Sequence, residues 1–326
     1  MKARQPLVAA LVAVVLAATG CKKLKPKPQE DPVAEGSTKD VTSDRSMQVM
    51  NYYVDFFNDL IDQVPDMTEN YWEHAGDAGL SVEEMTKWGN VICAGAGWMK
   101  MQRDEAKDRL GKVEKQSSGE FAKMPPLAKA MYDAAIAYAG ERDAMCAYVK
   151  GGAFKADNGA KAKDIHAALT KANDTWHAAV DALAAELERV EDAQSNAELA
   201  KHEADKSYGY WFRLATIRSN EFLRLARRDA AKAEPMLPKL TEALDGFAAY
   251  AKSKPDAHAS FVGFGKQVDR MQAALAKLGP ALAKASTPQA KQQVVDAASE
   301  DLMSIYNTMV SLHNTLVGAE ANGQLK

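Results

Sequence analysis

Cysteine and aromatic residues are scarce in this chain. Three cysteines occur among 326 residues, and Phe, Trp and Tyr together account for 7%. Neither Cys93 nor Cys146 has a second cysteine or a pair of histidines nearby, which excludes the ligand spacing of a zinc site. Segments in which apolar and polar residues alternate are missing at any convincing length. Together with thinly spread Gly and Pro, these absences argue against an all-β fold.

Charge of one sign is not in large excess either. The formal net charge is −3, and it becomes −5 if the first twenty residues are removed, because they contain Lys2 and Arg4. Binding of nucleic acid requires a concentrated basic face for the phosphates. We therefore expect no nucleic acid partner.

Motifs of catalysis and cofactor binding are absent as well. The chain has no Gly-x-Ser-x-Gly, no P-loop and no dinucleotide fingerprint. Glu198, His202 and Asp205 could offer three ligands from one helix, but an exposed ion pair on a polar face is the preferred interpretation. His313 lies among apolar residues and is expected to be a hydrogen-bonded core or interface histidine. We predict no catalytic residues, no metal and no cofactor.

The N-terminus carries an export signal. Lys2 and Arg4 precede an apolar run over residues 7–18, and Thr19-Gly20-Cys21 closes it. This order is typical of a secretory signal peptide, and the run is shorter than the ~20 residues of a membrane-spanning helix. A cysteine at this place resembles the lipobox of bacterial lipoproteins, in which the peptidase cuts before a lipidated cysteine. A plain secretory signal cut at small residues is the alternative.

Residues 21–43 differ in composition from the rest of the chain. Four lysines alternate with prolines, and acidic residues and Gly36-Ser37-Thr38 follow. Such a segment has little apolar surface to bury, so we expect an extended or disordered tether next to the lipid on Cys21. Its lysines favour anionic headgroups. Lys22, where an Asp would retain a lipoprotein at the inner membrane, predicts an outer-membrane anchor facing the periplasm.

Helical patterns fill the remaining chain, residues 44–320, which we interpret as one all-α domain. Apolar residues recur at spacings of three and four, and capping signals mark helix starts at Ser81 with Glu84 and at Thr287-Pro288. The stretch Lys161–Lys206 lacks Gly and Pro and predicts one long helix, or two joined near residues 192–196. The expected helices cover about residues 49–65, 81–99, 125–151, 161–206, 208–229, 235–255, 261–278 and 287–317.

The first and last helices share a spacing of asparagines. Asn51 and Asn58 are seven residues apart, as are Asn307 and Asn314, so each pair lies on one helix face. Asparagines in such positions fix register in coiled coils. We therefore predict an antiparallel bundle of long helices in which the N- and C-terminal helices are adjacent. Chance similarity of two amphipathic helices is the alternative.

Two further sets of candidate residues, a pair of cysteines and three arginines, each allow two interpretations. Outside the cytoplasm, Cys93 and Cys146 are expected either to form a disulfide or to remain two buried thiols. Arg213, Arg224 and Arg228 fall opposite the apolar stripe of their helix and could receive an anionic partner. The alternative is a solvated basic helix end that is stabilised by the helix dipole.

Three segments resemble a known family. Residues 52–60 (Tyr-Tyr-Val-Asp-Phe-Phe-Asn-Asp-Leu), 208–212 (Tyr-Gly-Tyr-Trp-Phe) and 306–314, with Asn307 and Asn314, are similar to the YiiG-like family of bacterial lipoproteins. The resemblance spans nearly all of the chain after the signal. It implies a lipobox, a low-complexity tether and a helical body, and it implies no mechanism because the family is of unknown function.

The sequence leaves two classes of function. The first, which we favour, is a membrane-anchored, non-enzymatic envelope lipoprotein that binds or scaffolds another envelope protein or an anionic polymer. The second is a periplasmic small-ligand carrier or an enzyme whose site is assembled from distant helices. An exposed groove would favour the first class, and a concave polar pocket would favour the second.

Overall fold

The computed structural model describes residues 41–66, 68–76, 79–93, 100–116, 119–254 and 258–323. Their regular elements are all helices, apart from an isolated bridge between Gly76 and Gly79, so the fold is all-α as predicted. The predicted signal peptide and most of the predicted tether lie outside the described residues. No helix within the described ranges is both long and apolar enough to cross a membrane. The α-helices are α2 (Val41–Asp66), α3 (Glu69–His74), α4 (Val82–Ile92), α5 (Lys100–Glu114), α6 (Met124–Lys150), α7 (Ala153–Ala156), α8 (Ala162–Lys201), α9 (Tyr208–Arg228), α10 (Ala230–Ala233), α11 (Leu237–Lys252), α12 (Ala259–Lys284) and α13 (Pro288–Ala321).

Helix ends follow the capping signals of the sequence. The Ser81 hydroxyl accepts from the backbone N–H of Glu84, whose carboxylate accepts from the N–H of Ser81, and this forms the predicted capping box of α4. Thr287 caps α13 by accepting from the N–H of Ala290, with Pro288 in the first turn. The Gly- and Pro-free stretch forms the single long helix α8.

The helical region consists of two compact units rather than the one domain expected over residues 44–320. Unit 1 ends at Val190 and unit 2 begins at Glu191, so the boundary lies inside α8. Composition could not reveal it, because no Gly, Pro or polar linker interrupts the helix there. The first residues of α2, Val41–Ser43, also extend the helix into the predicted tether.

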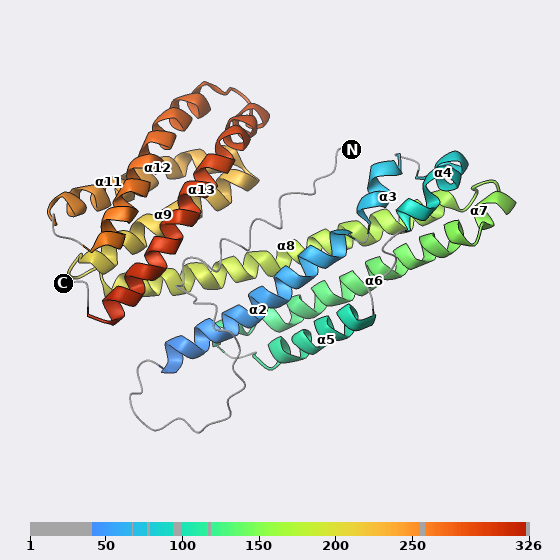
Figure 1. The fold of residues 1–326 in the computed structure, drawn as a ribbon, viewed down its shortest axis with the longest axis horizontal. Coiled ribbons are helices and arrows are strands. Elements are labelled where there is room, and N and C mark those ends of the chain that lie inside the picture. Colours follow the sequence, from blue (N-terminus) through green and yellow to red (C-terminus); the bar gives the residue numbers. More distant parts are fainter. Residues whose placement is uncertain are drawn as a thin grey trace. The chain divides into compact units, whose positions relative to one another are not determined.

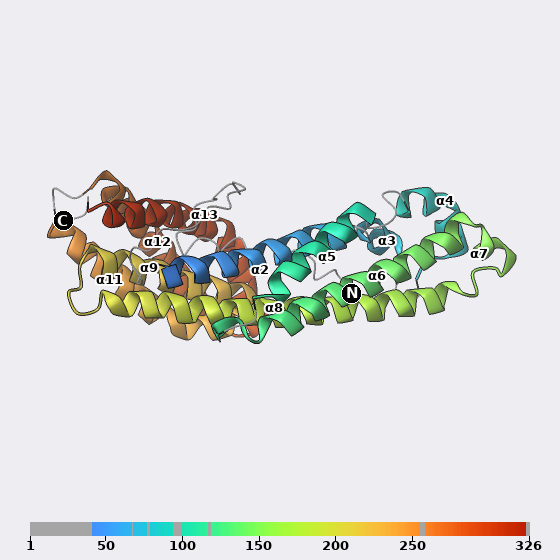
Figure 2. The ribbon, with the colours of Figure 1, turned by 90° about the horizontal axis from the view of Figure 1, so that it is seen from below.

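Unit 2 contains a four-helix bundle. α9 packs on α11, α11 on α12, α12 on α13 and α13 on α9, which closes a ring around one apolar core (Figures 1 and 2). Aromatic rings fill part of this core: Phe247 lies 4.8 Å from Phe261 and 4.9 Å from Phe264 between ring centroids. The short helix α10 and a 3₁₀ turn, Glu234–Met236, lead from α9 to α11, and residues 285–287 join α12 to α13.

Unit 1 is built on three mutually packed helices, α2, α5 and α6, with α3, α4 and α7 at one end. Hydrogen bonds hold α3 in place. The Trp72 indole donates to the hydroxyl of Tyr138 over 2.7 Å, and the hydroxyl of Thr68 lies 2.8 Å from the same oxygen. The Tyr71 hydroxyl lies 2.7 Å from Nδ1 of His166 on α8.

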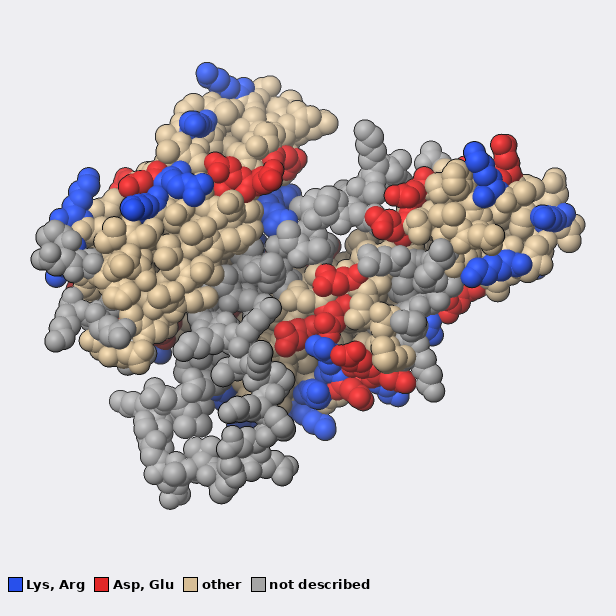
Figure 3. Space-filling view, viewed as in Figure 1, with Lys and Arg blue, Asp and Glu red and all other residues tan. Residues whose placement is uncertain are grey.

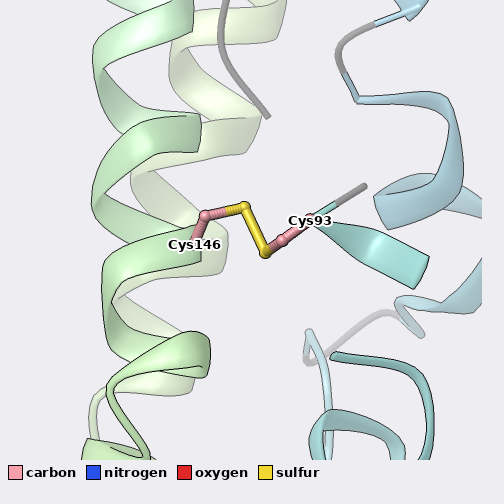
Figure 4. Close-up of a disulfide and its surroundings, with 2 residues drawn as sticks. All are labelled: Cys93 and Cys146. Carbon is pink, nitrogen blue, oxygen red and sulfur yellow. A yellow bond between two sulfur atoms is a disulfide. The ribbon is translucent and has the colours of Figure 1, made fainter. Parts of the chain in front are cut away.

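A disulfide joins Cys93, directly after α4, to Cys146 on α6 (Figure 4). The Cα atoms are 5.6 Å apart, which is usual for a disulfide. Of the two alternatives that the sequence left open for these cysteines, the structure therefore has the bond.

The two helices that were predicted to be adjacent, α2 and α13, belong to different units, so their adjacency stays a prediction. α2 packs on α5 and α6 of unit 1, whereas α13 packs on α12 and α9 of unit 2. Oδ1 of Asn51 and Oδ1 of Asn314 are buried and accept no hydrogen bond from the described residues.

Candidate functional site

A row of polar side chains lies between α9, the end of α8 and α13 of unit 2, and we call it the polar seam. On α13, Tyr306, His313 and Glu320 follow one another at seven-residue intervals, so they lie on one face. The seam comprises Glu191, Asp192, Glu198, Arg213, Thr216, Asn220, Arg224, Tyr306, His313 and Glu320.

Arg213 is the most connected member of the seam. Its side chain is 8% exposed, and Nη2 lies 2.7 Å from Oε2 of Glu320 and 3.9 Å from Oε1 of Glu198. Nη1 donates to the carbonyl of Gly209 over 3.0 Å. The guanidinium also stacks over the ring of Phe212 at 4.8 Å. These contacts neutralise a cation that burial would otherwise make costly.

His202 lies beside this ion pair at the surface. Its Nε2 is 3.7 Å from Oε1 of Glu198 and its Nδ1 is 3.9 Å from Oε1 of Glu320. α8 ends at Lys201, so His202 and Asp205 lie in the following turn and not on the helical face that the sequence suggested. Among the described residues, no group of three or more His, Cys, Asp or Glu is arranged to hold a metal ion.

Thr216 and His313 form the middle of the seam. The Thr216 hydroxyl donates to the Phe212 carbonyl over 2.8 Å and lies 3.0 Å from Nδ1 of His313. Since that hydroxyl proton is already donated, Nδ1–H of His313 is the donor to Thr216. Burial, followed by the charge of Arg213, lowers the pKa of His313 to about 3. His313 is therefore the neutral, hydrogen-bonded core histidine that the sequence predicted.

The other end of the seam joins α9 to α8. Nη1 and Nη2 of Arg224 donate to the two carboxylate oxygens of Asp192 over 3.1 and 2.7 Å. The Asn220 amide donates to Glu191, which is 1% exposed. Tyr306 is fully buried beside them; burial raises the pKa of its hydroxyl well above the usual value, and the charge of Glu191 adds to this effect.

The three arginines proposed for partner binding are not gathered on an open face. Arg213 pairs with Glu320 and Arg224 pairs with Asp192, both inside unit 2. Arg228 is exposed at the end of α9. The prediction of an arginine-lined binding face is wrong for Arg213 and Arg224, because α9 is covered on its polar side as well as on its apolar stripe.

An open groove of about 1240 Å³ lies on the other side of α9, where α9, α11 and α12 line it. Trp211 and Tyr210 form an aromatic pair there, edge to face, with ring centroids 5.0 Å apart. Gly246 of α11 allows the close approach of the indole: a Cβ at this position would lie 2.1 Å from Cζ3 of Trp211. Leu214 and Leu275 add apolar surface to the groove.

Charged side chains of both signs surround the aromatic pair. Lys239, Glu242 and Asp245 are exposed on α11, and Asp245 accepts a hydrogen bond from Gln272 over 2.6 Å. Lys206 lies over the ring of Tyr210, 5.8 Å from its centroid. Neither Lys239 nor Glu242 forms an ion pair with another described residue.

A second charged surface lies on unit 1, where acidic side chains gather over α2 and α5 (Figure 3). Arg109 pairs with Asp59 over 2.7 Å and with Glu105 over 2.9 Å. Burial raises the pKa of Asp59; the charge of Arg109 opposes this rise, and the carboxylates of Glu105, Asp55 and Asp62 add to it. The carboxylates therefore share one internal cation, and the surface offers no built ligand site.

Sequence reasoning missed the groove. Tyr210 and Trp211 belonged to a recognised aromatic segment, but the residues opposite them on α11 carry no motif. The one available signal is Gly246, an isolated glycine inside a helical pattern, which often marks a close approach.

Comparison with known proteins gives a family and no activity. No curated protein and no solved structure matches the chain. The family model DUF3829, described as a protein of unknown function, matches residues 44–315. The match covers most of the chain, and the chain therefore belongs to this uncharacterised family.

Proposed function

We propose that this protein is a lipid-anchored lipoprotein of the cell envelope whose helical body binds another polypeptide and catalyses no reaction. The charged start, short apolar run and Thr19-Gly20-Cys21 support the anchor. The observation that carries the binding role is the open groove of unit 2 with its aromatic pair, Tyr210 and Trp211.

The form of the groove favours a polypeptide. Sites for small molecules are concave and usually have volumes of about 300–1,000 Å³. The groove is open, has a larger volume and is lined by three helices. Its apolar floor with charged residues around it resembles the core and rim of a protein interface, in which Trp, Tyr and Arg are enriched.

A small-ligand carrier is the second candidate, since a small molecule could also settle against Trp211. The two candidates differ in what remains bound after purification. A polypeptide partner is captured by crosslinking in cells, whereas a carried ligand appears as a fixed added mass on the purified protein.

Photo-crosslinking in intact cells tests the binding role. A photoreactive residue at Leu214, which lines the groove, is expected to give a discrete protein adduct. The same residue at Val262, which is 48% exposed on α12 and does not line the groove, is the matched control and is expected to give none. Loss of the Leu214 adduct with Trp211→Ala would place the contact in the groove. No adduct at Leu214, with an added small mass on the native protein, would favour the carrier.

The anchor has its own test. Cys21→Ser is expected to release the protein from the membrane fraction into the soluble fraction, because the lipid is lost with the thiol. Lys22 further suggests an outer-membrane destination, so the wild-type protein is expected in outer-membrane fractions. Unchanged pelleting of Cys21→Ser would contradict the anchor and leave the groove experiment unaffected.

A further inference from the structure

We propose that the groove of unit 2 is occupied by the chain's own Lys/Pro-rich segment, residues 22–32, until a partner displaces it. The inference rests on the proposed role of the groove as a polypeptide site, and it adds a named occupant and a means of regulation. The segment reads Lys-Lys-Leu-Lys-Pro-Lys-Pro-Gln-Glu-Asp-Pro.

The aromatic pair suits the prolines of this segment. Proline-rich peptides bind as extended polyproline II helices to grooves lined by aromatic residues, since the ring of proline packs on an aromatic face and little entropy is lost. Pro26 and Pro28 alternate with lysines. Trp211 and Tyr210, set edge to face in the groove, offer two aromatic surfaces to such a peptide.

Charge supports the same occupant. The carboxylates of Glu242 and Asp245 line the groove and form no ion pair within the described part of the chain. Lys25 and Lys27 flank Pro26, so an extended segment with its prolines on the aromatic pair carries ammonium groups to the neighbouring carboxylates.

The charge of the segment changes from positive to negative along its length, and the charge along α11 in the groove changes sign as well. Glu30 and Asp31 follow the lysines, and Lys239 precedes the carboxylates on α11. From Lys27 to Glu30, a polyproline helix rises about 9 Å. From Lys239 to Asp245, an α-helix also rises about 9 Å. One register therefore pairs Lys27 with Asp245 and Glu30 with Lys239.

The segment can come from the same molecule or from a neighbour in the membrane. Twelve residues lie between Pro28 and Val41, the first residue of α2, so the chain takes thirteen residue steps from one to the other. Extended as polyproline, this stretch reaches about 40 Å. In either arrangement a polypeptide partner competes with the segment for Trp211, so binding of the partner and release of the tether are linked.

A photoreactive residue at Gln29 of the full, lipidated chain tests the inference. We expect crosslinks to peptides of α9 around Trp211 or of α11 around Asp245. The double variant Lys239→Glu with Asp245→Lys should lower their yield about tenfold, since the two attractive pairs of this register become repulsive. Adding Lys27→Glu and Glu30→Lys should restore the yield. Asp269→Lys with Lys277→Glu, which reverses one exposed charge of each sign outside the groove, is the matched control and should leave the yield unchanged.

The outcomes separate the two proposals. If the Leu214 probe captures a partner while the Gln29 probe crosslinks only to lipid or outside the groove, the groove is a binding site and the tether does not occupy it. A Gln29 crosslink that the charge reversal leaves unchanged would also overturn the inference. A mixture of heavy- and light-isotope chains distinguishes a crosslink within one molecule from one between molecules.

Discussion

A guanidinium buried as deeply as that of Arg213 is stable only with partners on several sides. Glu320 supplies the nearest charge, and Gly209 and Phe212 supply a carbonyl and an aromatic face. The sequence predicts either an arginine that receives an anionic partner or a solvated one, because its helical position lies opposite the apolar stripe. A sequence pattern shows which face of a helix is polar, but it does not show whether another helix covers that face.

Removing Glu320 should therefore destabilise the protein. Glu320→Ala leaves the buried cation of Arg213 with the carboxylate of Glu198, 3.9 Å away, and with no other carboxylate partner among the described residues, and we expect a loss of about 2 kcal/mol in the free energy of unfolding. The matched control is Lys201→Ala, which removes an exposed pair with Glu198 and should cost less than about 1 kcal/mol. Urea unfolding monitored by circular dichroism measures both, and equal losses would contradict the role of the seam.

His313 should make stability depend on pH. Its pKa is about 3 in the folded protein, whereas in the unfolded chain it is near the ordinary 6.5. Between these values only the unfolded chain takes up the proton. The free energy of unfolding should therefore fall as pH drops from 6.5 towards 3, by up to about 1.4 kcal/mol per pH unit, and this residue should have no effect above 6.5.

The variant His313→Gln isolates this contribution. Carboxylates also titrate in the acidic part of this pH range, but they do so in the wild type and in the variant alike, so their contribution cancels in the comparison. We expect the slope of unfolding free energy against pH, measured by urea unfolding at pH 4, 5, 6 and 7, to be shallower in the variant below pH 6.5. Parallel slopes would show that His313 is protonated in the folded state.

Among the elements, α11 depends on a single glycine for its contact with α9. In Gly246→Ala the new Cβ would collide with the Trp211 indole, so the ring must shift, and we expect a loss of about 1–3 kcal/mol. Gly265→Ala on α12 is the matched control. Its Cβ would lie 3.6 Å from Phe247, an ordinary contact, so the gain in helix propensity of about 1 kcal/mol should prevail. Thermal melts compare them, and similar midpoints would contradict the packing.

The sequence predicted long helices well and polar helices poorly. α13, α9 and α8 follow clear apolar periodicity or have clear caps. α5 was missed, although Ala106, Leu110 and Val113 lie at helical spacing and are buried, because charged residues dominate this helix. The groove and the polar seam depend on contacts between helices. Those contacts cannot be predicted from the residue pattern of one helix alone.

At the scale of the whole molecule, the disulfide acts on one unit. It joins residues with a sequence separation of 53, both in unit 1. The chain-entropy relation gives about 4 kcal/mol for a loop of this size. In Cys93→Ser with Cys146→Ser, hydrogen exchange should quicken in α4 and α6 and stay unchanged in α12 and α13. Equal acceleration in both units would show that they unfold as one.

The polar seam has a consequence for how α13 assembles on α9. Two of its contacts join these helices directly: Thr216 with His313, and Arg213 with Glu320. A slip of α13 by one turn moves it about 5.4 Å and breaks both contacts together. Apolar contacts alone would tolerate such a slip. Misaligned forms of unit 2 should therefore be scarce even early in folding, since no alternative alignment satisfies the buried charges.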